Sequence, residues 1–342
     1  SIPALEGILL STGENSLELC AYDLELGITT VIPAQIGEPG KAVLSAKLFS
    51  DIVRRSPAET LTVSVDEKNM APRESGSSRF TIIGIPAEEF PELPRLSDST
   101  QITLPSNLLK SMIRQTLFAV AESDAKPIHQ GSLFHLEQGM LDVVSVDGYR
   151  LAKRSEPVNF SEDLSFVVPG KTLGEILKLL KDTDDSVEIS AGRRHILFTI
   201  DNYTVISSLL EGEFLNYKAA IPPESQTEVI LKTREAIESV ERVSLLITDR
   251  LKSPVRCLFA DNEMKLNCTT SMGRASDQLD VEMTGQSVEI GFNNRYLLEA
   301  LRNTECDEVK IQLGGPLSPM KVVPKEGDNF LFLVLPVRLK SE

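Results

Sequence analysis

The Gly-Lys-Thr triplet at residues 170–172 is the first candidate for chemistry, because it matches the end of a phosphate-binding P-loop. A P-loop also needs a glycine five positions before Gly170, and Ser165 stands there. The triplet is therefore expected to begin a helix. No G-x-S-x-G, H-E-x-x-H or G-x-G-x-x-G pattern occurs, and Asp184-Asp185 falls in a turn-like stretch. The sequence thus predicts no catalytic residue and favours a protein that is not an enzyme.

The cysteines and histidines are too widely spaced to predict a metal site. No pair of cysteines has C-x-x-C spacing, and the histidines are scattered: Cys20, Cys257, Cys268, Cys306, His129, His135 and His195. We expect reduced, mostly buried thiols in a cytoplasmic protein without a cofactor. No apolar run approaches the length of about 18 residues that a membrane helix needs. Residues 1–5 also lack the basic stretch of a signal peptide.

The elements that would carry any function recur along the chain with an offset of 124 residues. At this offset a cation, then an acid four positions on, then a second cation appear three times, with apolar residues between them in the same phase. Such self-similarity predicts three copies of one domain, spanning residues 1–97, 98–222 and 223–342. The recurring residues are Lys47, Lys171 and Arg295, then Asp51, Glu175 and Glu299, then Arg54, Lys178 and Arg302.

The first copy is expected to be incomplete at its front. The second copy begins with a strand at Ile102 and the third with a strand at Val229, and a helix follows each strand. The same offset places the corresponding strand of the first copy before residue 1. We therefore expect domain one to lack its first strand and helix, through truncation or disorder.

Each copy combines alternating strands with amphipathic helices, so the predicted fold class is α+β with mostly antiparallel pairing. The helices are expected at 45–55, 105–122, 169–181, 232–248 and 293–304. They carry 13 Lys and Arg against 7 Asp and Glu, whereas the whole chain has a net charge of −15. A surplus of six positive charges on the helices leaves the remainder at −21.

The charge pattern allows two interpretations. An acidic chain should repel nucleic acid, and a charged helix face is usually only solvated, with ion pairs between neighbouring turns. Three helices of the same polarity in an acidic protein instead favour a long polyanion that contacts every domain. No aromatic platform for single strands is visible. A duplex bound through its phosphates, without sequence preference, is the predicted partner.

Four segments resemble the bacterial DNA sliding clamp, the beta subunit of DNA polymerase III. Residues 146–152, Val-Asp-Gly-Tyr-Arg-Leu-Ala, resemble the family's D-G-[HY]-R-L-A motif, the most specific of the four. Residues 1–10 resemble a first-domain strand, residues 85–91 resemble the end of that domain, and Leu335-Pro-Val-Arg-Leu339 resembles the C-terminal tail. The resemblance covers the whole chain.

The resemblance implies three domains of the DNA-clamp fold, each of two β-α-β-β-β units. Two chains would close head to tail into a homodimeric ring, with helices lining the hole and sheets outside. The ring would encircle duplex DNA and tether the replicative DNA polymerase as a processivity factor, without an active site. The polymerase and the clamp loader would bind through short linear motifs. A paralogue that confers antibiotic resistance, or another scaffold with altered partners, is the alternative.

The resemblance also implies a pocket for partner peptides. The alternative is that these residues belong to the cores of domains two and three. Leu215 replaces a proline that the family often has, and Ala219 replaces an arginine that is sometimes found there, which affects the expected peptide preference. Arg150 and Arg338 are expected as polar anchors at the pocket rim. The implied pocket residues are Val146, Gly148, Tyr149, Arg150, Leu151, Leu215, Leu317, Pro319, Leu333, Val334, Leu335, Pro336, Val337, Arg338 and Leu339.

Two further sets follow from the resemblance. The ring interface would join Phe80 and Ile82, on an edge strand of domain one, to Leu245 and Leu246 of domain three, although Phe80 and Ile82 could equally be core residues. The DNA-facing set would comprise Lys47, Arg54, Lys110, Arg114, Lys126, Lys171, Lys178, Arg242, Arg295 and Arg302.

Overall fold

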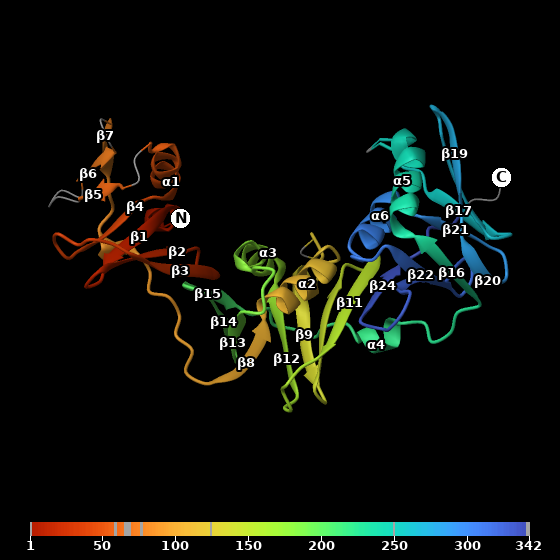
Figure 1. Cartoon of the computed structure of the whole chain (residues 1–342), viewed down its shortest axis with the longest axis horizontal. Coiled ribbons are helices and arrows are strands. Elements are labelled where there is room, and N and C mark those ends of the chain that lie inside the picture. The colour runs from red at the N-terminus through yellow and green to blue at the C-terminus, as the bar shows by residue number, and fades with distance from the viewer. Residues whose placement is uncertain are drawn as a thin grey trace. The chain divides into compact units, whose positions relative to one another are not determined.

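The computed structural model of the chain describes residues 2–57, 60–64, 70–75, 78–123, 125–248 and 250–339. The chain forms two compact units. The first comprises Ser1–Ser106 and Leu179–Leu209, and the second comprises Asn107–Lys178 and Leu210–Glu342. Each unit is built around antiparallel sheets, which confirms the predicted α+β class (Figure 1).

The first unit contains an eight-stranded sheet in the order β4-β1-β2-β3-β15-β14-β13-β8. Strands β3 and β15 pair antiparallel, with Ile28 opposite Val205, so the sheet runs without a break across the boundary predicted between residues 97 and 98. A three-stranded sheet, β5-β6-β7, completes this unit. The strands are β1 (Gly7–Thr12), β2 (Ser16–Tyr22), β3 (Leu26–Pro33), β4 (Lys41–Ser45), β5 (Thr62–Val63), β6 (Met70–Ser75), β7 (Ser78–Ile83), β8 (Ser99–Pro105), β13 (Ser186–Gly192), β14 (His195–Ile200) and β15 (Tyr203–Ser208).

The second unit contains a nine-stranded sheet in the order β12-β9-β10-β11-β24-β23-β22-β16-β20. Pairing of β11 with β24 joins the second repeat to the third in the same way. A four-stranded sheet, β19-β18-β17-β21, accompanies it. The strands are β9 (Gly131–Glu137), β10 (Met140–Val146), β11 (Arg150–Pro157), β12 (Leu164–Pro169), β16 (Thr227–Lys232), β17 (Val255–Ala260), β18 (Glu263–Thr270), β19 (Gly273–Asp280), β20 (Glu282–Gly285), β21 (Val288–Phe292), β22 (Glu308–Leu313), β23 (Met320–Pro324) and β24 (Phe330–Val334).

All five predicted helices are present, although each is shorter than predicted. They are α1 (Ala46–Arg55), α2 (Ser106–Leu117), α3 (Gly170–Leu179), α5 (Thr233–Val243) and α6 (Asn294–Arg302). Side chains cap the starts of α1 and α6: the Ser45 hydroxyl accepts from the Leu48 N–H, and the Asn293 amide oxygen accepts from the Arg295 N–H. After α5 the chain tightens into the 3₁₀ turn η4 (Ser244–Leu246), which explains why the predicted helix to residue 248 ends early.

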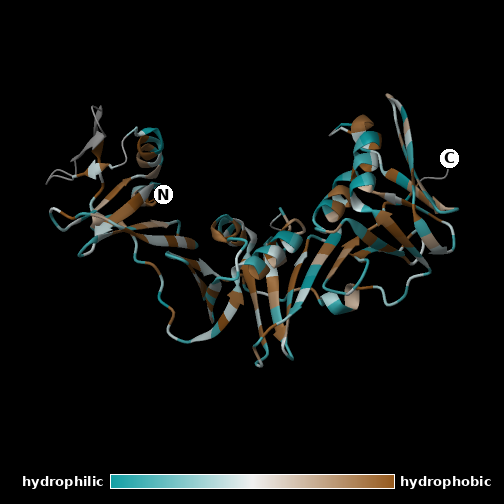
Figure 2. Cartoon of the chain, viewed as in Figure 1, coloured by the Kyte–Doolittle hydropathy of each residue, from teal (hydrophilic) through white to brown (hydrophobic). Residues whose placement is uncertain are grey.

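The helices bury an apolar stripe and expose a polar one, as their period requires. Figure 2 shows hydrophilic and hydrophobic residues interleaved on α5 and α6. These two helices pack against each other, and α6 also packs against β24. Val240 and Leu297 are among their residues in the core of the second unit, with Phe292 and Phe332 from the sheets. No helix in the described ranges is long and apolar enough to cross a membrane.

The cysteines follow the prediction of reduced, mostly buried thiols. Cys20, Cys257 and Cys268 are buried, Cys306 is half-buried, and all four are free. Complete burial raises the pKa of the Cys257 thiol to about 12. This thiol therefore stays protonated and acts as a small core residue.

Candidate functional site

Strand pairing brings three apolar members of the predicted peptide pocket onto one face of the nine-stranded sheet. Val146 lies opposite Leu151 in the β10–β11 pair, and Leu151 lies opposite Leu333 in the β11–β24 pair. Directly opposed residues share a face of the sheet, which we call the pocket face. All three side chains are at most 5% exposed and form a cluster with Tyr217. They can therefore form the floor of a pocket.

Two further predicted members are exposed apolar side chains. Tyr149 is 61% exposed and Leu317 is 67% exposed. The backbone N–H of Leu335 donates to the carbonyl of Tyr149 at 2.9 Å, and that of Val337 donates to the carbonyl of Gly291 at 2.8 Å. These bonds hold the C-terminal tail extended while several of its side chains stay accessible. Of the other predicted members, Gly148, Leu215, Leu335, Val337 and Arg338 are exposed, Pro319, Pro336 and Leu339 are half-buried, and Val334 is buried on the opposite face.

A cavity of about 590 Å³ lies between residues 125–129 and residues 211–216 of the second unit. This volume falls within the usual range of ligand sites, about 300–1,000 Å³. Its lining includes Leu215 from the predicted pocket and Lys126 from the predicted DNA-facing set, together with Ile128 and Phe214. The structure therefore places Lys126 beside the pocket. The resemblance did not include Ile128 or Phe214 among the pocket residues. The turn-like residues next to each of them mark surface loops, where binding residues are common.

Helix α4 (Tyr217–Ala220), which the sequence analysis missed because it has only four residues, holds this wall in place. The Tyr217 hydroxyl donates to Asp142 Oδ2 at 2.7 Å and lies 2.8 Å from His135 Nδ1. Burial and the Asp142 carboxylate raise the pKa of Tyr217, so the hydroxyl keeps its proton. Because that proton goes to Asp142, the proton shared with His135 resides on Nδ1.

Replacing Tyr217 by phenylalanine is expected to lower the free energy of unfolding by about 1–3 kcal/mol, because it removes the hydroxyl that bonds the half-buried Asp142 and His135, and hydrogen bonds to charged groups are the stronger ones. The ring itself would remain in the apolar cluster. Chemical denaturation of the wild type and the variant measures the difference. Tyr203→Phe, at a hydroxyl outside this network, provides the control. Equal stability of Tyr217→Phe and the control would show that the hydroxyl contributes nothing.

Arg150 is not at the pocket rim, contrary to the expectation. Because strand residues alternate in direction, its side chain lies on the face opposite Leu151, and it is 3% exposed. Its Nε donates to Asp147 Oδ2 at 2.9 Å, and its guanidinium also pairs with Glu299 of α6. The guanidinium carbon lies 4.5 Å from the centre of the Tyr296 ring. Arg150 is therefore a buried tie between β11 and α6.

The residues around Arg150 also contact members of the predicted peptide pocket and of the predicted DNA-facing set. Tyr149 stacks on Tyr296 with ring centres 5.7 Å apart, and Glu299 also accepts from Arg295 Nε at 3.0 Å. Burial lowers the pKa of the Arg150 guanidinium, whereas Asp147 raises it. Burial raises the pKa of the neighbouring Tyr296 hydroxyl, because it disfavours the charged form of a tyrosine as well. The local network therefore links the pocket rim at Tyr149 to the basic face of α6 through Tyr296 and Glu299.

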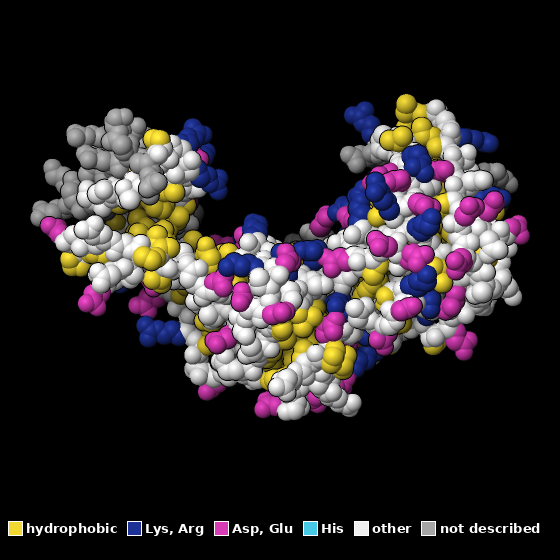
Figure 3. Space-filling model, viewed as in Figure 1, with side chains coloured by type: hydrophobic (Ala, Val, Ile, Leu, Met, Phe, Trp, Pro, Cys, Tyr) yellow, Lys and Arg dark blue, Asp and Glu magenta, His cyan; other side chains and the backbone are white. Residues whose placement is uncertain are grey.

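Apart from Lys126, the predicted DNA-facing cations lie on helices, and at least five of the ten are in ion pairs. The pairs are Arg114–Glu305 at 2.7 Å, Lys178–Glu175 at 2.8 Å, Arg242–Asp277 at 2.6 Å, Arg302–Glu241 at 2.5 Å and Arg295 with Glu122 at 2.5 Å. These five cationic side chains are still 47–69% exposed. Lys47, Arg54, Lys126 and Lys171 are exposed, and Lys110 is half-buried. Figure 3 shows Lys and Arg grouped over α1, and mixed with Asp and Glu over α5 and α6.

The predicted interface residues differ in exposure. Leu245 on η4 is 81% exposed, whereas Leu246 is half-buried against the core. Ile82 of β7 is 6% exposed and packs with Leu10 and Leu44, so it is a core residue. The side chain of Phe80 lies outside the described residues. The next residue after Ile82, Ile83, is 76% exposed, as the alternation of the strand requires, and it replaces Ile82 as the apolar residue available on this edge strand.

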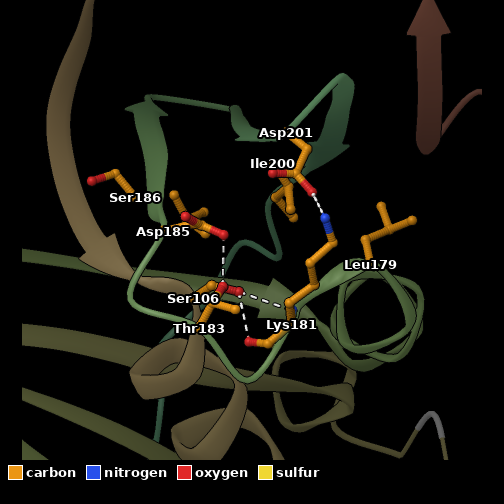
Figure 4. A pocket seen from close by; sticks show the side chains of 9 residues that line it. Ser106, Leu179, Lys181, Thr183, Asp185, Ser186, Ile200 and Asp201 are labelled. Atoms are coloured by element: carbon orange, nitrogen blue, oxygen red, sulfur yellow. Dashed lines mark hydrogen bonds and ion pairs between the residues drawn. The ribbon is translucent and has the colours of Figure 1, made fainter. Parts of the chain in front are cut away.

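A second, much smaller hollow lies in the first unit, where β8 and β13 meet the segment that follows α3 (Figure 4). The Ser106 hydroxyl donates to the Lys181 carbonyl at 2.9 Å, and Lys181 Nζ pairs with Asp201 Oδ2 at 2.6 Å. This pairing raises the pKa of Lys181. The hollow measures about 10 Å³, hardly enough for one water molecule. These contacts therefore fasten the chain and do not form a ligand site.

Comparison with known proteins places the whole chain in one family. Models of the N-terminal, central and C-terminal domains of the DNA polymerase III beta subunit match residues 1–94, 103–216 and 218–338. The beta sliding clamp of Bacillus subtilis is 31% identical over 352 residues, which cover 99% of this chain and 93% of that protein. The crystal structure of the Bacillus subtilis DNA polymerase sliding clamp gives a TM-score of 0.94 at 29% identity, covering 99% and 93%. A Pseudomonas aeruginosa sliding clamp bound to griselimycin gives 0.93 at 27% identity, covering 98% and 92%. The chain therefore belongs to the bacterial sliding clamps, the beta subunits of DNA polymerase III.

Proposed function

We propose that two copies of this chain close head to tail into a ring that encircles duplex DNA and tethers the replicative polymerase as a processivity factor. The observation that carries this proposal is the similarity to sliding clamps along 99% of the chain. In this proposal the chain is a scaffold in the cytoplasm, with no reaction of its own and no cofactor. The comparisons do not favour the alternative of a paralogue with altered partners.

The three repeated domains carry the ring in this proposal, with boundaries at 97/98 and 222/223. Unpaired edge strands invite pairing with a second chain. Strand β7 with Ile83 is an edge of its sheet in the first unit, and β19 beside Leu245 is an edge in the second. In a head-to-tail ring of two chains, the β7 edge of each chain would meet the β19 edge of the other, which gives two identical interfaces. The solution mass of the ring would be twice the chain mass of 37.6 kDa, which light scattering measures; a monomer at micromolar concentration would contradict it.

The DNA contacts in this proposal are weak and exchangeable. An exposed ion pair contributes about 0–1 kcal/mol, so a phosphate can replace Glu305 or Glu241 as the partner of its arginine at little cost. Phosphate contacts carry no sequence information. A ring held on DNA by closure needs no stronger grip, and loose contacts permit sliding.

Replacing both Lys47 and Arg54 of α1 by glutamine is expected to reduce the salt dependence of duplex binding. Each phosphate contact contributes about −0.9 to the slope of log K against log salt, so losing two should make the slope shallower by about 2. Anisotropy titrations with a labelled duplex at several salt concentrations measure it. The control is Lys325→Gln, whose cation pairs with Glu308 outside the helices at 2.6 Å. An unchanged slope in the double variant would remove α1 from the DNA-facing surface.

Partner proteins would bind at the pocket face, between the 590 Å³ cavity and the C-terminal tail. The apolar floor, the exposed apolar rim and the extended tail suit a short peptide with large apolar side chains. The polymerase and the clamp loader are the proposed partners. Titration of a labelled polymerase-derived motif peptide tests this, and Leu333→Asp, at the pocket floor, should abolish binding. Full binding by this variant, once circular dichroism shows that it is folded, would place the partner elsewhere.

A further inference from the structure

Lys321 is a buried lysine on the pocket face, and neither the resemblance nor the charge pattern pointed to it. It lies opposite Leu333 in the β23–β24 pair, and Leu333 lies opposite Leu151. The three side chains therefore form one row across neighbouring strands. Lys321 is only 7% exposed. A cation thus stands directly beside the apolar floor of the proposed peptide pocket.

The ammonium group of Lys321 has one hydrogen-bond acceptor among the described residues. Its Nζ donates to the carbonyl of Pro222 at 2.9 Å, whereas an ammonium has three protons to donate. Within the described part of the chain, no carboxylate lies within ion-pair distance of it. Burying a cation without a counter-charge is costly, so the site would gain from an incoming anion.

Two acids of this sheet face, Glu228 and Asp142, are already engaged. The row continues from Lys321 to Gln312 on β22 and then to Glu228 on β16. Glu228 Oε1 accepts from Gln312 Nε2 at 2.7 Å, and it is two strands, or about 10 Å, from Lys321. On the other side, Asp142 is bound by Tyr217 and lies 3.7 Å from Lys153. Neither of these two carboxylates pairs with Lys321.

We propose that Lys321 determines specificity in the partner pocket by binding a carboxylate of the partner peptide, either its C-terminal group or an Asp or Glu side chain next to its apolar residues. This inference rests on the proposed function, because it assumes that the pocket face receives a peptide. The apolar residues would occupy the floor at Leu151 and Leu333, and the carboxylate would complete the donors of Lys321. A peptide with an amide at the same point would leave the ammonium unsatisfied.

Three forms of one labelled polymerase-derived motif peptide test the proposal by anisotropy. The first ends at the motif with a free carboxylate, the second ends there with an amide, and the third is an amide extended by one glutamate. Wild-type protein is expected to bind the first or third peptide about tenfold more tightly than the second, since charge-assisted hydrogen bonds are the stronger ones. Preference for the first identifies the C-terminal group as the source, and preference for the third identifies a side chain.

Lys321→Met keeps the length of the apolar stem and removes the charge. It is expected to fold, because an apolar group replaces a buried cation, and to bind all three peptides equally, within about twofold of the wild-type affinity for the simple amide. Lys325→Met, just after β23 and paired with Glu308, should keep the wild-type preference. A wild type that binds all three peptides equally, or a preference that survives in Lys321→Met, would overturn this inference alone. Failure of every peptide to bind the wild type would overturn the peptide pocket as well.

Discussion

Replacing Arg150 by alanine is expected to lower the free energy of unfolding by about 3–5 kcal/mol, the cost of removing one partner from a buried ion pair. The guanidinium satisfies Asp147 and Glu299, and Glu299 sits on α6 within the core-forming helix pair. Without Arg150 the Glu299 carboxylate keeps only Arg295, and the ring of Tyr296 loses the cation packed on it. Urea denaturation of the variant measures the loss.

Arg114→Ala is the matched control for this prediction. Arg114 also pairs with a glutamate, Glu305, but its side chain is 47% exposed, so its loss should cost no more than about 1 kcal/mol. The affinity of Arg150→Ala for the peptide should fall only if the Tyr149 ring no longer stacks on Tyr296. A loss of stability no larger than that of Arg114→Ala would show that Arg150 is not the structural tie between β11 and α6.

Replacing Leu245 by aspartate is expected to weaken dimer formation at least a hundredfold. A leucine that is 81% exposed in the single chain and is covered in the ring would contribute about 1.5–3 kcal/mol, and a buried carboxylate without a partner costs more. A factor of 100 corresponds to about 2.8 kcal/mol. Sedimentation of the wild type and the variant over a range of concentrations measures the dissociation constant.

Leu24→Asp controls for the general effect of a new surface charge. Leu24 is 50% exposed and lies in the turn between β2 and β3, far in the sequence from either predicted edge, and its positive φ of 77° suits aspartate. This variant should dimerise as the wild type does. A Leu245→Asp protein that dimerises equally well would exclude η4 from the ring interface.

The regular parts of the structure were predictable because they follow local periodicity. The shared charges and apolar phase at an offset of 124 located the helices, and the helices are present. Their ends were less predictable, because they depend on contacts such as the 3₁₀ turn at Ser244–Leu246 rather than on composition. Helix α4 escaped because four residues are too few to show a period.

The directions of single side chains were the weaker part of the prediction. Arg150 follows Tyr149 and precedes Leu151 in one motif, and treating the motif as a unit concealed that alternate residues face opposite ways. Because of the same alternation on β7, Ile82 faces the core and Ile83 is the exposed residue. Pairs such as Arg114–Glu305 and Arg302–Glu241 join residues that are far apart in the sequence, so no local pattern could reveal how many of the predicted cations already have partners.

If the protein holds DNA by encircling it, cutting a circular DNA must release the protein. The dimer is placed on nicked circular plasmid by its clamp loader, free protein is removed by gel filtration, and half of the sample is linearised with a restriction enzyme. An encircling ring is expected to stay with the circles and to be lost from the linear molecules by sliding off their ends. Loss from both forms at the same rate would contradict it.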